Sequence, residues 1–328
     1  MLNKDAFTKF SDAQVGETIS RPVLVASISE NIAKNGKPFL RVNLKDGFSE
    51  ITANMFETSA KDLENLNIYK ETIADVKLAV SEYQGSKSFK INEICPAKDK
   101  SITLGDFVKV PPVDPDVMYD EICSLIRKSA DDCGGKYTAL SELALEILSD
   151  KKASYMTSSA AVSMHHNLKG GLLYHSYIMV KAADEICNVY TTLDKELLLC
   201  GAALHDIGKI WEYKTSASGD AEFTTNGVLF GHLYMGASLI KQYSQKHSYN
   251  KEKVQLLTHL ILSHHGTLEW GAVSCPAVAE AFALHYIDNL DAKMYTCEEQ
   301  CENLNFGEMT EKKPFGLDNR IYKPDYNK

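Results

Sequence analysis

The chain has 328 residues, of which 44% are apolar and 24% charged, a composition typical of a globular protein large enough for two domains. Its formal net charge of −9 at pH 7 excludes a protein that wraps nucleic acid through a globally basic surface. The first hundred residues carry equal numbers of basic and acidic side chains, so the whole excess of negative charge lies in residues 101–328. The net charge therefore does not exclude a local groove that binds nucleic acid.

Residues 12–97 predict a small β-barrel domain. Short β-branched and apolar segments alternate there with turn signals such as Asn35-Gly36 and Asp46-Gly47. Five strands with one short helix before the fourth favour a barrel of the OB type, and an SH3-like or other small barrel is the alternative. The expected strands cover 21–28, 39–44, 50–56, 72–81 and 88–94, and the expected helix covers 58–66.

The chain becomes helical after a segment rich in proline. Residues 98–115 predict an interdomain linker, because prolines recur there and helical periodicity is weak. Residues 116–300 predict an all-α domain, and residues 301–328 predict an extended tail with no role that the sequence assigns. The predicted fold class is therefore α+β multidomain, an OB-type barrel followed by helices. Helices are expected over 116–130, 137–150, 171–190, 194–207, 231–246, 251–264 and 276–295.

All ten histidines of the chain follow residue 164. Several of them, with two aspartates, stand on or beside apolar stripes of the predicted helices, where burial without a metal or a partner would be unfavourable. Imidazole and carboxylate are ligands of borderline divalent metals, and one carboxylate can bridge two ions in a site that hydrolyses phosphoesters. The sequence thus predicts a metal site built from His175, His205, Asp206, His232, His264 and Asp288.

Five segments in this region carry a family resemblance. The order H, HD, H, HH, D on successive helices is similar to the HD-domain metal-dependent phosphohydrolases. The segments are MHHNLKGGLLYHSYIMV, LCGAALHDIGKIWEY, GHLYMGASLI, LILSHHGTLEWGAVSCP and EAFALHYIDNLDAKM. Taken together, they resemble the YhaM-type 3′-to-5′ exoribonucleases, which carry an OB domain before the HD domain, and the resemblance covers residues 12–300.

The resemblance implies two divalent ions that share the carboxylate of Asp206. Mn²⁺ is the favoured ion, and Co, Fe, Ni, Zn and Mg are alternatives. Lys209, one turn beyond the HD pair, would stabilise the charge that develops on the phosphate, so His205, Asp206 and Lys209 form the predicted catalytic group. For Lys209, a surface position at the C-terminus of a helix is the alternative. The core ion would be held by His175, His205, Asp206 and Asp288, and the second by His232 and His264. His265 is the alternative to His264, and Asp291, one turn from Asp288, is the alternative to Asp288.

Candidate substrate contacts fall in both domains. The resemblance implies that His165, His166 and Asn167 lie beside the cleft, and capping of a helix or loop is their alternative role. Trp270 either stacks on a base or packs beneath the helices, and packing is the favoured role. OB folds bind single strands by stacking bases on aromatic rings, with basic residues along the phosphates. The candidates in the barrel are Lys37, Phe39, Tyr83, Lys87 and Phe89, and for the two phenylalanines a place in the barrel core is the favoured alternative.

These features predict a hydrolase, a divalent-metal-dependent 3′-to-5′ exoribonuclease that releases nucleoside 5′-monophosphates from single-stranded RNA, with DNA as an alternative substrate. The direction and the product are implied by the resemblance. One alternative is an HD phosphohydrolase of free nucleotides or cyclic dinucleotides. Another is a single-strand-binding protein without catalytic activity, and a diiron oxygenase is a more distant one.

Cysteine usage and hydropathy predict the compartment. The eight cysteines form no CxxC pair and most of them lie in apolar runs, which is typical of reduced thiols in a cytoplasmic protein. Residues 1–10 contain no apolar core of a signal peptide, and no apolar stretch approaches the length of a membrane span. A homo-oligomer is compatible with the sequence.

Overall fold

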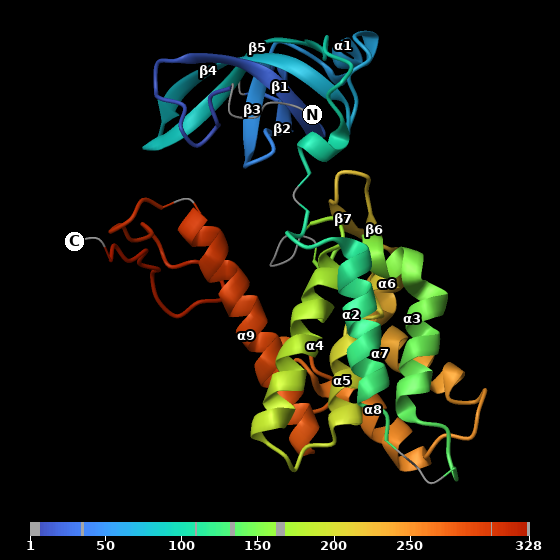
Figure 1. Cartoon of the computed structure of the whole chain (residues 1–328). Helices are drawn as coiled ribbons and strands as arrows, with labels where there is room; N and C mark the ends of the chain where they lie inside the picture. The colour runs from blue at the N-terminus through green and yellow to red at the C-terminus, as the bar shows by residue number, and fades with distance from the viewer. Residues whose placement is uncertain are drawn as a thin grey trace. The chain divides into compact units, whose positions relative to one another are not determined.

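The computed structural model describes residues 7–33, 36–108, 110–131, 135–161, 168–302 and 304–326. It divides into two compact units, Met1–Lys109 and Val110–Lys328 (Figure 1). Each unit has a hydrophobic core of its own. Among the described residues, no helix combines the length and the apolar character that crossing a bilayer requires. The candidates His165, His166 and Asn167 lie outside the described residues.

The first unit is a closed five-stranded barrel with the strand order β1-β2-β3-β5-β4, which confirms the predicted OB-type fold. A short helix, α1 (Ala60–Asn65), lies between the third and fourth strands, as expected. Alternating residues of the strands fill the interior, so that Leu40, Val42 and Leu44 are fully buried. The strands are β1 (Thr18–Ile32), β2 (Pro38–Lys45), β3 (Glu50–Phe56), β4 (Ile73–Tyr83) and β5 (Ser86–Pro96).

Strand β1 is longer than its sequence predicts because it serves two neighbours. Its first half pairs with β4 and its second half pairs with β2, both antiparallel. The register with β2 shifts between Val25 and Ser27. Such an irregularity bends a strand and increases its twist, which lets one strand continue around a small barrel.

The second unit is helical, and all seven predicted helices are present. Helix α5 lies at the centre, with almost every side chain buried between the surrounding helices. Helix α3 extends further than predicted because the buried Tyr155 near its end donates a hydrogen bond to the carbonyl of Ala203, at 3.0 Å. The helices are α2 (Pro115–Lys128), α3 (Leu140–Thr157), α4 (Gly171–Val189), α5 (Lys195–Leu204), α7 (Thr225–Tyr243), α8 (Lys251–Ser263) and α9 (Ala279–Glu302).

The segment between α5 and α7 differs from the prediction. It contains a one-turn helix, α6 (Lys209–Glu212), and a short hairpin of β6 (Tyr213–Thr215) and β7 (Ala221–Phe223). These elements are too short to produce a periodic pattern in the sequence. Helix α7 also begins before the predicted residue 231, and Gly231, with φ 68° and ψ 159°, interrupts it. Only glycine adopts that backbone conformation readily, so the helix bends there.

The tail is folded rather than simply extended. Within the described residues 304–326, Thr310 donates a backbone hydrogen bond to Ile321 at 2.8 Å, which pairs two stretches of the tail. The Lys323 ammonium donates to the carbonyls of Cys301 and Leu304, at 2.8 and 2.9 Å, at the end of α9. The tail thereby returns to the helix that precedes it, and the expectation of an extended arm was wrong for this part.

Candidate metal centre

The centre is organised by the turn that follows α5. His205 caps the C-terminus of α5 and Asp206 comes next, and both side chains are almost fully buried. Gly208 has an ordinary right-handed backbone, yet a Cβ atom there would lie 2.1 Å from the carbonyl oxygen of His232. No other residue fits such an approach without moving the backbone. Glycine therefore lets the turn pack against the helix that carries His232.

Four histidines each have Nδ1 engaged by an acceptor. The Nδ1 atoms of His205 and His264 lie 2.9 and 2.8 Å from the carbonyls of Ala202 and Ile261. His175 Nδ1 lies 2.6 Å from the Asp291 carboxylate, and His232 Nδ1 lies 3.0 Å from that of Glu212. A proton on Nδ1 leaves the lone pair on Nε2, so each ring presents a ligand atom on its other side.

The two carboxylate oxygens of Asp206 face different histidines. Oδ2 lies 3.3 Å from His205 Nε2 and 3.7 Å from His175 Nε2. Oδ1 lies 3.5 Å from His232 Nε2 and 3.7 Å from His264 Nε2. Two ligands that each lie about 2.1 Å from one ion are at most about 4.2 Å apart. All four separations satisfy this limit, so the residues fit one divalent ion on each side of Asp206.

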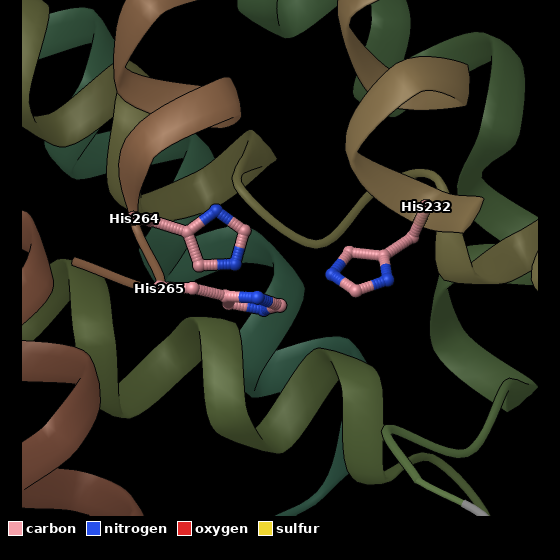
Figure 2. A group of neighbouring side chains, drawn as sticks. All are labelled: His232, His264 and His265. Atoms are coloured by element: carbon pink, nitrogen blue, oxygen red, sulfur yellow. The ribbon is translucent and has the colours of Figure 1, made fainter. Parts of the chain in front are cut away.

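The remaining predicted ligands complete the two groups. Asp288 Oδ1 lies 3.3 Å from His175 Nε2. His265 joins His232 and His264 in a second group whose nitrogen atoms lie within 4.8 Å of one another, with His232 opposite the two neighbouring histidines (Figure 2). Three buried atoms here, Asp206 Oδ1, His232 Nε2 and His265 Nδ1, have no hydrogen-bond partner. Bound cations would satisfy all three, because a buried polar atom without a partner is unfavourable.

The protonation states suit a cation. Burial lowers the pKa of His264 well below its usual value, and that of His265 in the same direction, so both rings are neutral. Burial opposes ionisation of Asp206, but the charge of Lys209 and the interactions with His205 outweigh it and hold the pKa of the carboxyl well below normal. Burial also disfavours charge on His175, but hydrogen bonds to Asp288 and Asp291 raise its pKa to about 10. Metal binding at His175 would therefore release a proton.

Addition of a divalent ion is expected to stabilise the helical unit. An ion that binds only the folded state raises the free energy of unfolding by about 2.7 kcal/mol at a concentration a hundred times its Kd. In domains of roughly 150–250 residues this corresponds to an increase in Tm of about 5–11 °C. Calorimetric scans of chelator-treated protein, with and without added MnCl₂, measure the shift. An unchanged transition at saturating MnCl₂ would contradict the site.

A cavity of about 460 Å³ opens onto the metal ligands. Lys209 lines it, and its ammonium lies 2.6 Å from Asp206 Oδ2. Trp270 also lines it, with 60% of its surface exposed. Of the two roles open to Trp270, the exposed face fits contact with a ligand better than packing beneath the helices. The cavity has room for part of a nucleotide chain beside the metal ligands.

The barrel candidates divide into exposed and buried side chains. Phe89 is 6% exposed and packs in the barrel core with Phe10, the place favoured for it from the sequence, so little of its ring is available to a base. Tyr83 and Lys87 are exposed. Phe39 is partly buried and stacks on the exposed Phe56, with 5.8 Å between ring centroids. Lys37 is exposed and pairs with Glu57.

Sequence reasoning did not identify Glu212, which orients His232. Besides accepting from the ring, its carboxylate accepts the backbone N–H of His232 at 3.0 Å. The residue is buried, although glutamate is rarely buried without a partner. The only signal in the sequence is its place three residues after Lys209, in a helix of one turn. The tertiary fold brings Glu212 to His232 because α6 packs against α7.

The segment that carries the centre matches a known domain family. Residues 172–301 match the HD domain family. A protein of Bacillus subtilis (strain 168) named 3′-5′ exoribonuclease YhaM is 34% identical over 317 residues, which cover 96% of this chain and 98% of that protein. Its namesake in Bacillus velezensis is 34% identical over 316 residues, which cover 96% of this chain and 97% of that protein.

Among solved structures, the chain is similar to the second OB-fold domain of replication protein A from Methanococcus maripaludis. The sequences are 17% identical, and the match covers 28% of this chain and 96% of that domain, with a TM-score of 0.22. The full-length match to the Bacillus proteins is what shows the family. This chain belongs to the YhaM family of HD-domain proteins.

Proposed function

We propose that this protein is a divalent-metal-dependent 3′-to-5′ exoribonuclease that degrades single-stranded RNA to nucleoside 5′-monophosphates. The observation that carries the proposal is the position of Asp206, whose two oxygens face two separate sets of histidine Nε2 atoms. Paired metal sites of this kind serve phosphodiester hydrolysis. Two relatives that match almost the full chain bear the name 3′-5′ exoribonuclease, which supports the substrate and the direction.

Each residue of the centre takes a definite task in this proposal. Bound divalent ions, with Mn²⁺ as the favoured one, would supply a nucleophile from water and neutralise charge on the phosphate. His175, His205, Asp206 and Asp288 would hold the core ion, and His232, His264 and His265 would hold the second. Lys209 stabilises the negative charge that develops on the phosphoryl oxygens, an effect that is strong in a largely buried site.

We assign RNA binding to the barrel, residues 12–97, and catalysis to residues 116–300, with 98–115 as the connection and 301–328 as the tail. The exposed rings of Tyr83 and Phe56, with Lys87 and Lys90 nearby in sequence or space, offer the combination of aromatic and basic groups that OB folds use on single strands. All described cysteines are free, which supports a reducing compartment such as the cytoplasm.

End-labelled RNA tests the proposal. With Mn²⁺, 5′-labelled single-stranded RNA should shorten stepwise, and 3′-labelled RNA should release labelled mononucleotide at once. Release of labelled mononucleotide from the 5′ end before any shortened labelled RNA appears would overturn the direction. Hydrolysis of free nucleotides but not of RNA would support a nucleotide phosphohydrolase, and RNA binding without hydrolysis would support a single-strand-binding protein.

A further inference from the structure

The folded tail forms one wall of the catalytic cavity. Phe315 and Gly316 line the same cavity as Asp206 and Lys209. A second, more open groove shares Trp270, Phe315 and Gly316 with that cavity, so the two are continuous. The tail therefore belongs to the surroundings of the metal ligands, although the sequence assigns it no role.

Residues 313–318, called the tail loop below, are anchored in a way that leaves one aromatic side chain exposed to solvent. Pro314 and Leu317 are buried, whereas Phe315 between them is 80% exposed. The Lys293 ammonium on α9 donates to the carbonyl of Gly316 at 3.1 Å. Two buried side chains and this hydrogen bond hold the loop, so the Phe315 ring is kept at the cavity without being needed for the packing of the loop.

The groove offers the chemistry that recognises single-stranded RNA. Phe315 and Trp270 present exposed ring faces, and bases of any sequence stack on such faces. Lys293 and Lys313 supply positive charge for phosphates, and Asn289 supplies an amide that can bond to base edges or ribose. Asp318 also lines the groove, and its negative charge opposes the binding of phosphates. An acidic peptide would use the lysines but leave the rings uncovered, so the aromatic pair favours RNA.

We propose that the tail loop and Trp270 form a subsite for the nucleotides that flank the scissile phosphate, in which Phe315 and Trp270 stack on bases and Lys293 and Lys313 contact phosphates. This inference rests on the proposed exoribonuclease function. It makes Phe315 a positioning residue: the ring orients RNA along the groove but does not touch the reacting phosphorus.

Steady-state kinetics with two substrates test the subsite. In the full-length protein with Mn²⁺, Phe315→Ala should raise the KM for an RNA tetranucleotide between about fivefold and a hundredfold, the range expected for the loss of one base–aromatic stack. The hydrolysis of methyl p-nitrophenyl phosphate, a small diester that carries no base and has a ring on its leaving group alone, should stay unchanged. Phe315→Tyr should restore the KM, since a phenol ring stacks equally well. Tyr326→Ala is the matched control, a tail aromatic that is 90% exposed and lines neither cavity.

The possible results distinguish a failure of the proposed subsite from a failure of the proposed exoribonuclease function. An unchanged KM for RNA in Phe315→Ala, with RNA still degraded by the wild type, would overturn the subsite and leave the exoribonuclease standing. An equal loss on both substrates would also overturn it, because the ring would then act on the metal centre and not on the bases. A wild-type protein that hydrolyses the small diester but not RNA would overturn the proposed function and the subsite with it.

Discussion

Asp206→Asn is expected to reduce RNA hydrolysis at least about a thousandfold, the loss that corresponds to roughly 4 kcal/mol of transition-state stabilisation by the metal ions. Asparagine keeps the volume of the side chain but offers an oxygen to only one of the two histidine sets. Its amide NH₂ would point at the other set and cannot ligate a cation. The Lys209 ammonium, 2.6 Å from the carboxylate, would also lose its charged partner.

Two measurements check this result. Single-turnover degradation of labelled RNA gives the rate, and calorimetry shows whether the variant has lost the increase in Tm with MnCl₂. Asp120→Asn on α2 is the control, because it makes the same chemical change at an exposed residue outside the cavity lining. If Asp206→Asn hydrolysed RNA at the rate of the control, the metal centre could not be the catalytic site.

Asp291→Asn is expected to weaken metal binding or activity about ten- to a hundredfold, the usual effect of losing a carboxylate that orients a ligating histidine. The carboxylate of Asp291 lies 2.6 Å from His175 Nδ1, on the opposite side of the ring from Asp206. It fixes the tautomer that frees Nε2 and makes the ring a better ligand. A neutral amide can accept the same hydrogen bond but does not supply the charge.

The Mn²⁺ dependence of the rate distinguishes this role from a merely structural one. Asp291→Asn should require a higher Mn²⁺ concentration for half-maximal rate, and saturating Mn²⁺ should recover much of the activity. Glu298→Gln, an exposed position further along α9, serves as control. A loss of activity with the same Mn²⁺ dependence as wild type would count against an orienting role for Asp291.

Much of the fold follows from local patterns. The helices appeared in the sequence because their apolar residues recur at helical spacing, and the strands because apolar segments end at turn signals. The errors lie where local patterns are short or where one element serves two partners. Helix α6 has one turn, β1 pairs on both sides of a bulge, and α7 passes through a bend at Gly231.

The ligand candidates were visible in the sequence because histidine and aspartate are rarely placed on apolar helical stripes without a reason. The sequence did not show which of these residues bind metal directly and which orient the ligands. Asp288 and Asp291 stand one turn apart on α9, and only the packing of α9 against α4 brings the first to Nε2 of His175 and the second to Nδ1. The role of Glu212 depends in the same way on contact between α6 and α7.

By itself, the sequence determined the barrel, the helical domain, the set of residues able to bind metal and the family that they resemble, because these depend on residue type and periodic spacing. The tertiary structure decided which oxygen of Asp206 faces which histidines, why Phe89 is unavailable and Phe315 available, and where the tail lies. Those properties depend on contacts between segments far apart in the chain, for which a single sequence carries no local signal.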